Sequence, residues 1–137
     1  MIRMGLAEKR AVQAFQAEKL GEWQKKLNAL TGAELELEIL WDEVVKEGYA
    51  ENFPTLMEEN YFLPLEKALQ NVCADAMGKE AFNAKIKKVK IEGNYDGSIL
   101  VTKINGDILE LNADSRCNRH DLDEFTQVIV ESLEEIL

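Results

Sequence analysis

The dipeptide Asn105-Gly106 constrains the fold of this chain more than any other feature, because it predicts a tight β-hairpin. Apolar and polar residues alternate on both sides of it, as they do in half-buried strands. Asn-Gly is typical of a two-residue type I′ turn, in which both residues take positive φ. Such a turn fixes the register, and the pairs that share one face of the sheet are Leu100 with Leu111, Thr102 with Leu109 and Ile104 with Asp107.

Two further segments are predicted to be strands. Residues 34–39 alternate between a glutamate and an aliphatic residue, and residues 86–92 place lysines on one face. A four-residue loop at 94–97 makes the 86–92 strand the antiparallel neighbour of the hairpin, whereas an odd loop would bury a lysine. The covered face then carries Val89, Ile91, Leu100, Ile104, Leu109 and Leu111, and the second face carries Lys88, Lys90, Val101, Lys103, Ile108 and Glu110. Because glutamates complement these lysines, the 34–39 strand is expected beside the 86–92 strand.

Helical spacing of apolar residues predicts helices over 6–30, over 65–76 closed by Gly78, and from residue 121 onward. Short helical turns are expected after Asp42 and Thr55. Pro64 either opens a separate helix or kinks a continuous one. The element order is therefore α-β-α-α-β-β-β-α. It predicts a two-layer α+β fold with a mostly antiparallel four-stranded sheet and helices on one face.

Length, hydropathy and charge define the class of protein. A chain of 137 residues with 46% hydrophobic content suits a single domain spanning residues 1–137. No apolar run approaches the roughly 18–20 residues that span a bilayer, and residues 1–10 lack the apolar core of a secretory signal, so a cytoplasmic location is expected. The net charge of −10 disfavours nucleic acid and anionic membranes, which are bound through Lys and Arg. Such a charge suits solubility, and less often a basic protein partner.

The densest group of reactive side chains lies between the last predicted strand and the last predicted helix. Cys117 and His120 could act there as nucleophile and base, with Arg116 and Arg119 lowering the thiol pKa or binding an anionic group. Their spacing matches no catalytic signature, however. Catalytic partners also usually meet across a fold rather than within one loop. The alternative interpretation is a polar connection that caps the following helix.

No metal or cofactor is predicted. One histidine and two separated cysteines do not make a zinc site, and no segment has the alternating oxygen ligands of a calcium loop. The two cysteines lie in different settings, which indicates reduced thiols rather than a disulfide framework. The motifs GxGxxG, GxxxxGK[ST], GxSxG and HExxH do not occur, so nucleotide binding and common hydrolase chemistry lack support.

Two regions are candidate partner surfaces. The segment 41–62 combines aromatic residues, among them Trp41, Tyr49 and Phe53, with many acids. Such a stretch is either a contact surface or a small core beneath a long connection. The second sheet face carries Val101 and Ile108 among charges, and it would suit dimerisation or partner binding if no helix covers it.

These observations predict a small, acidic, cytoplasmic protein that is not an enzyme. Its expected role is that of a protein-binding or self-associating module, with a protein partner or a second copy of itself as the ligand. The alternative is a small enzyme or ligand-binding protein that uses residues 114–121 around an anionic group.

Overall fold

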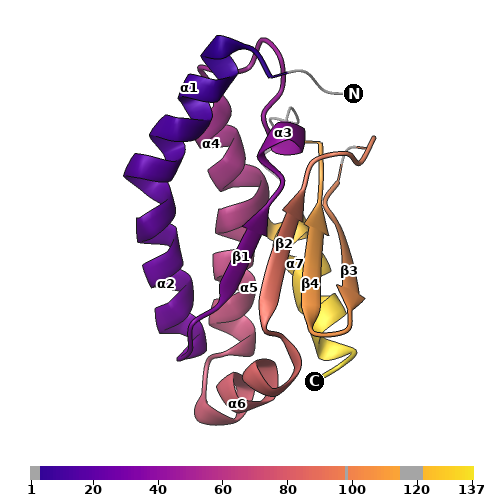
Figure 1. Cartoon of the computed structure of the whole chain (residues 1–137). Coiled ribbons are helices and arrows are strands. Elements are labelled where there is room, and N and C mark those ends of the chain that lie inside the picture. Colours follow the sequence, from indigo (N-terminus) through magenta and orange to yellow (C-terminus); the bar gives the residue numbers. More distant parts are fainter. Residues whose placement is uncertain (1–3, 98, 115–121) are drawn as a thin grey trace.

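The computed structural model describes residues 4–97, 99–114 and 122–137, and it confirms the α+β class. Its sheet has four strands. Figure 1 shows α5 (Leu63–Val72) and α7 (Leu122–Glu134) behind the sheet, and a long N-terminal helix alongside α4 (Phe53–Met57) and α5. The helices therefore cover one face of the sheet, as the alternation of apolar and polar residues in the strands requires. No described helix lies in front of the other face in this view.

The N-terminal helix runs through α1 (Leu6–Phe15), a π-helical segment η1 (Gln16–Leu20) and α2 (Gly21–Thr31). It ends at Gly32, whose φ of 74° is the left-handed conformation typical of a helix C-terminus. The prediction of a helix over 6–30 is confirmed. Its apolar stripe is buried against the rest of the core through Val12, Phe15, Trp23 and Leu27.

A second long helix runs through α4 (Phe53–Met57), a π-helical segment η2 (Glu58–Phe62) and α5 (Leu63–Val72). Pro64 lies in the first turn of α5, and the widened turn η2 directly precedes it. A proline lacks the N–H that an interior helical residue donates, so an altered turn at this place relieves the mismatch. The short helix α3 (Trp41–Val44) precedes this second long helix.

Helix α6 (Ala76–Lys85) begins where the sequence predicted that the preceding helix would end. Asp75 caps it, with its side-chain oxygen accepting from the Gly78 backbone N–H at 2.8 Å. Gly78 therefore lies inside α6 rather than closing the helix before it, and the predicted extension of that helix to residue 76 is wrong. The helices between the first two strands are α3, the continuous helix of α4 and α5, and α6.

The sheet is mixed and mostly parallel, which corrects the prediction of a mostly antiparallel sheet. Its strands are β1 (Glu36–Ile39), β2 (Lys88–Glu92), β3 (Val101–Asn105) and β4 (Ile108–Asn112), in the spatial order β1-β2-β4-β3. β1 lies beside β2, as predicted, and the two strands are parallel. β2 and β4 are also parallel, whereas β3 and β4 are antiparallel. β4 thus occupies the place beside β2 that the sequence analysis assigned to β3.

The β3–β4 hairpin is present, but its turn differs from the predicted one. Asn105 pairs with Ile108 and Ile104 with Leu109, so the register is shifted by two residues. Gly106 has a φ of 64°, whereas no non-glycine residue among those described has positive φ. A type I′ turn needs positive φ at both central residues, and a type II′ turn needs it only at the first, where glycine is preferred. The turn is therefore of the II′ kind, with Gly106 and Asp107 at its centre.

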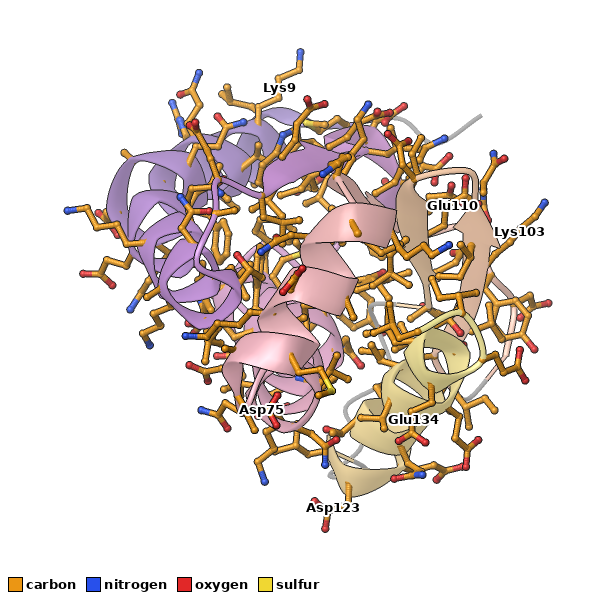
Figure 2. All side chains as sticks on the ribbon, turned by 90° about the horizontal axis from the view of Figure 1, so that it is seen from below. Lys9, Asp75, Lys103, Glu110, Asp123 and Glu134 are labelled. Atoms are coloured by element: carbon orange, nitrogen blue, oxygen red, sulfur yellow. The ribbon has the colours of Figure 1, made fainter. Side chains whose placement is uncertain are left out.

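A shift of two residues leaves every side chain on its predicted face, because the side-chain period of a strand is two. Val89, Ile91, Leu109 and Leu111 are fully buried beneath the helices, and so is Leu100, which lies just before β3. The helix α7 (Leu122–Glu134) packs against α5 and β3. Its buried residues are Phe125, Ile129, Val130 and Leu133. Figure 2 shows Lys103 and Glu110 on the side of the sheet away from α7.

Candidate functional site

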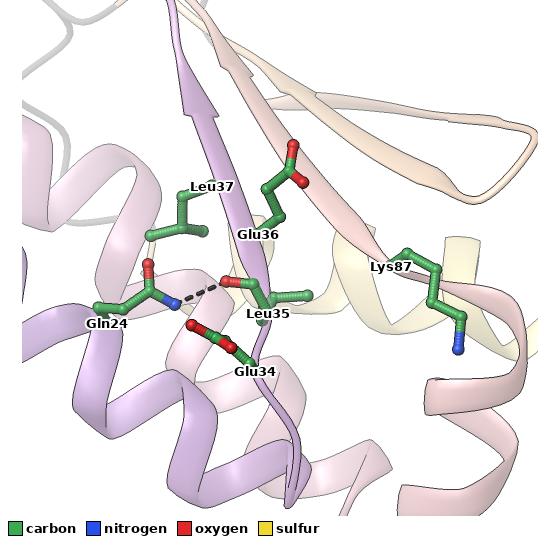
Figure 3. A pocket seen from close by; sticks show the side chains of 6 residues that line it. All are labelled: Gln24, Glu34, Leu35, Glu36, Leu37 and Lys87. Atoms are coloured by element: carbon green, nitrogen blue, oxygen red, sulfur yellow. Dashed lines mark hydrogen bonds between the residues drawn. The ribbon is translucent and has the colours of Figure 1, made fainter.

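A cleft of about 490 Å³ lies where α2 meets the beginning of β1 (Figure 3). Gln24 spans it, with its side-chain amide donating to the Leu35 carbonyl oxygen at 2.6 Å and to the Asn28 side chain at 2.9 Å. The Leu35 backbone N–H donates to the Asn28 side-chain oxygen at 2.9 Å. These contacts join the helix to the strand, so we interpret the polar groups of this cleft as structural.

The stronger candidate is the uncovered face of the sheet, which we call the open face. Strand alternation positions its side chains, since each lies two residues from the next along its strand. Its members are Glu36 and Glu38 of β1, Lys88, Lys90 and Glu92 of β2, Ile108, Glu110 and Asn112 of β4, and Val101, Lys103 and Asn105 of β3.

One row of the open face alternates in charge across all four strands. The register pairs Glu38 with Lys90, Lys90 with Glu110 and Glu110 with Lys103. Each charge therefore has opposite charges in the adjacent strands, an arrangement that stabilises strand pairing. We call these four residues the central row.

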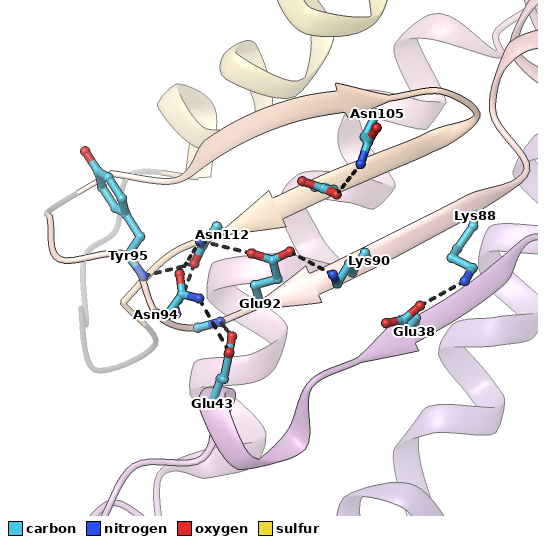
Figure 4. Close-up of polar contacts among 11 residues, drawn as sticks. Glu38, Glu43, Lys88, Lys90, Glu92, Asn94, Tyr95, Asn105 and Asn112 are labelled. Carbon is cyan, nitrogen blue, oxygen red and sulfur yellow. Dashed lines mark hydrogen bonds and ion pairs between the residues drawn. The ribbon is translucent and has the colours of Figure 1, made fainter. Parts of the chain in front are cut away.

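Lys88 is the most strongly paired residue of the open face (Figure 4). Its ammonium lies 2.8 Å from a carboxylate oxygen of Glu38 and 3.1 Å from one of Glu36. The hydrogen bond from Lys88 lowers the pKa of Glu38 below its ordinary value. Hydrogen bonds to Glu38 and Glu36 raise the pKa of Lys88. The prediction that glutamates of the first strand complement lysines of the next is confirmed.

A polar network closes one end of the open face (Figure 4). The Asn112 side-chain oxygen accepts from the backbone N–H groups of Asn94 and Tyr95 at 3.1 and 3.0 Å. Its amide donates to Glu92 at 3.2 Å, and Glu92 also lies 3.4 Å from the Lys90 ammonium. These contacts fix the chain where it leaves β2.

The side chains at the β3 edge of the open face are more accessible to a partner. Lys103 is exposed, and among the described residues no hydrogen bond or ion pair to its ammonium is found. Glu110 accepts a hydrogen bond of 3.4 Å from the Asn105 amide, which is long for such a bond. The predicted partner residues Val101 and Ile108 are both partly exposed on this side of the face.

The other predicted partner residues lie in a different environment. Phe53 is only 2% exposed, and its ring centroid is 5.8 Å from that of Phe15 and 6.4 Å from that of Trp41. Trp41 is partly buried against the same cluster, whereas Tyr49 is 39% exposed. The aromatic residues at 41 and 53 therefore belong to the core beneath the connection, which was the alternative interpretation of this segment.

The predicted reactive residues Arg116, Cys117, Arg119 and His120 lie outside the described residues. Within the described part, Cys73 is 4% exposed, and burial raises the pKa of its thiol, which opposes thiolate formation. The same residues contain no group of three or more His, Cys, Asp and Glu side chains placed to hold a metal ion. The helices over 4–97, 99–114 and 122–137 include none that combines the length and apolar character needed to cross a membrane.

The charged residues lie on the predicted face, but the central row was not predicted, because β3 was expected beside β2. That arrangement would have set Lys88 opposite Lys103, and like charges in directly opposed positions destabilise a strand pair. This repulsion is the sequence signal that could have indicated β4, with Glu110, as the neighbour of β2. Comparison of the chain with protein-family models, with characterised proteins and with solved structures finds no match.

Proposed function

We propose that this protein is a non-enzymatic, cytoplasmic protein-binding module and that the open face is its contact surface. The observation that carries the proposal is a four-stranded sheet whose second face, uncovered by the described helices, holds aliphatic side chains among charges of both signs. Protein interfaces commonly combine an apolar centre with polar and charged surroundings.

The charge pattern favours protein over other kinds of ligand. Nucleic acid and anionic membranes are bound through clusters of Lys and Arg that neutralise phosphates. On the open face, each lysine of β2 instead has a carboxylate within ion-pair distance, Glu36 and Glu38 for Lys88 and Glu92 for Lys90. A surface of alternating sign complements another protein surface of alternating sign, which provides specificity more than raw affinity.

Part of the open face is already held by contacts within the chain, namely the Lys88 ion pair along β1 and β2 and the Asn112 network. Binding then orders fewer side chains, and less conformational entropy is lost.

The test compares proteins retained from a native cell extract by the immobilised chain and by two single-charge variants. Lys103→Glu reverses an exposed charge on the open face, and Lys25→Glu makes the same change on the exposed side of α2. We expect a partner that the wild type and Lys25→Glu retain and that Lys103→Glu loses. A partner retained by Lys103→Glu and lost by Lys25→Glu would place the contact surface on the helices and contradict the proposal.

A further inference from the structure

We propose that a second copy of this chain binds the open face, with the two sheets packed face to face about a two-fold axis parallel to the strands. This inference rests on the proposed function, because it uses the same surface. It is carried by the symmetry of the central row, whose charges run minus, plus, minus, plus from β1 to β3.

A symmetric dimer brings one surface patch against itself. An axis along the strands, midway between β2 and β4, reverses the order of strands in the second copy and keeps each row at its own height. Glu38 then faces Lys103 of the second copy, and Lys90 faces Glu110 of the second copy. The row has four alternating charges, so the same row read in the opposite direction has the opposite sign at each position. Every member of the central row therefore meets an opposite charge.

The other face-to-face arrangement has the opposite outcome. A two-fold axis perpendicular to the strands, lying between the two sheets, would place each strand over its own copy. Lys90 would then face Lys90 and Glu110 would face Glu110, and like-charge juxtaposition across an interface is unfavourable by several kcal/mol. The charge pattern therefore favours the axis parallel to the strands over the perpendicular one.

The remaining rows are compatible with the same axis. In the row that the register aligns with Lys88, Ile108 faces the aliphatic stem of that lysine in the second copy, and Glu36 faces the amide of Asn105. In the third row, Glu92 faces Asn112 of the second copy, whose amide already donates to Glu92 and Asn94 of its own chain, so this row adds no hydrogen bond across the interface. The contacts of the Lys88 row pair an apolar group with an apolar stem and a carboxylate with an amide donor.

The dimensions of a sheet allow these contacts. Stacked sheets lie about 10 Å apart, and the outer strands lie about 7 Å from an axis between the two central ones. Twist turns stacked sheets by about 30°, which displaces the outer side chains by about 4 Å and leaves them within reach of long Lys and Glu side chains. A face of about 19 by 17 Å is small for an interface, so we expect a weak dimer that forms at high protein concentration.

The test uses two charge reversals, Lys103→Glu and Glu38→Lys. Each variant alone would set like charges against each other at both symmetric contacts and should weaken association at least tenfold. Mixed in equal amounts, the variants form a heterodimer in which a Glu faces a Lys at both contacts, so the mixture should regain the dimer. Sedimentation equilibrium up to millimolar concentration in low salt measures the association, and added salt should weaken it.

The matched control is the pair Lys25→Glu and Glu135→Lys, which makes the same charge changes at exposed positions on α2 and just beyond α7. These variants should dimerise as the wild type does. If either reversal unfolds the chain by circular dichroism, Lys103→Ala and Glu38→Gln replace them, and each should weaken association without the repulsion.

Three outcomes would overturn the inference: a wild type that stays monomeric at millimolar concentration, reversals that dimerise like the wild type, or a mixture that remains monomeric although the wild type dimerises. The first of these leaves the proposed function standing, because the capture experiment tests it with a different partner. Loss of the captured partner by Lys25→Glu rather than Lys103→Glu contradicts the proposed function without reference to the dimer.

Discussion

Gly78 lies so close to the carbonyl oxygen of Val72 that a Cβ atom at position 78 would be 1.9 Å from it. The contact joins the first turn of α6 to the end of α5, and Asp75 between them caps α6. The two helices can turn this sharply because residue 78 has no side chain. The Val72 backbone cannot move away as the end of a flexible side chain could, so it limits how close α6 can come to α5.

Gly78→Ala should therefore destabilise the protein by about 1–3 kcal/mol, as expected when a tightly packed place is overfilled. Gly21→Ala is the matched control, since a Cβ there would meet nothing within 4 Å. That change should stabilise the protein by about 0.4–1 kcal/mol, because alanine restricts the unfolded chain. Urea denaturation followed by circular dichroism measures both, and equal effects would contradict the close approach of α5 and α6.

Gly106→Val should destabilise the hairpin by about 1–3 kcal/mol, because a β-branched residue is strained at the φ of 64° found there. Asn105→Val should have a much smaller effect, because Asn105 belongs to β3 and does not have positive φ. Thermal unfolding of the two variants distinguishes the turns. A large loss from Asn105→Val would indicate a type I′ turn instead.

Leu100→Ala should lower the free energy of unfolding by about 2–5 kcal/mol, because the side chain is 0% exposed and its removal leaves a cavity. Lys103→Ala, on the opposite face of the same chain segment, should change it by less than about 0.5 kcal/mol. Chemical denaturation of both proteins gives the comparison. A sensitive Lys103 and a tolerant Leu100 would mean that the assignment of the two sheet faces is reversed.

Lys88→Met should raise the pKa of the Glu38 carboxyl, because it removes the hydrogen bond that lowers that pKa. NMR titration of the side-chain carboxyl carbon measures the change. The stability due to a lowered carboxyl pKa is present above the ordinary glutamate value and is lost as the pH falls through the lowered one. Lys88→Met should therefore make unfolding less sensitive to acid, and an unchanged Glu38 titration would rule out the pairing in solution.

The faces of the sheet were predictable because alternation is local. Any even shift of register keeps Val89 and Leu109 on the covered face. The assignment of side chains to the two faces was therefore correct although the predicted turn type was wrong. Strand order was not predictable in the same way. Antiparallel pairing of β2 with β3 and parallel pairing of β2 with β4 bury the same apolar side chains, and only cross-strand charges separate the two arrangements.

Helix boundaries show the same division between local and distant causes. Gly32 closes α2 as a glycine after a helical stripe is expected to do. Gly78 resembles such a residue in sequence, but it is required by its contact with Val72, which only the tertiary arrangement reveals. The open face was predicted as a set of residues, whereas the order of charges within it depends on the position of β4.

The order β1-β2-β4-β3 has a consequence for the chain while it is being made. β2 is complete before either strand of the hairpin exists, and the strand that will pair with its second side is the last of the four to be synthesised. During that interval β2 presents an unpaired edge, which is a template for pairing with another nascent chain. Lysines next to apolar residues in such a strand act as gatekeepers against aggregation. We expect Lys88 and Lys90 to oppose such pairing at an edge that the finished sheet no longer has.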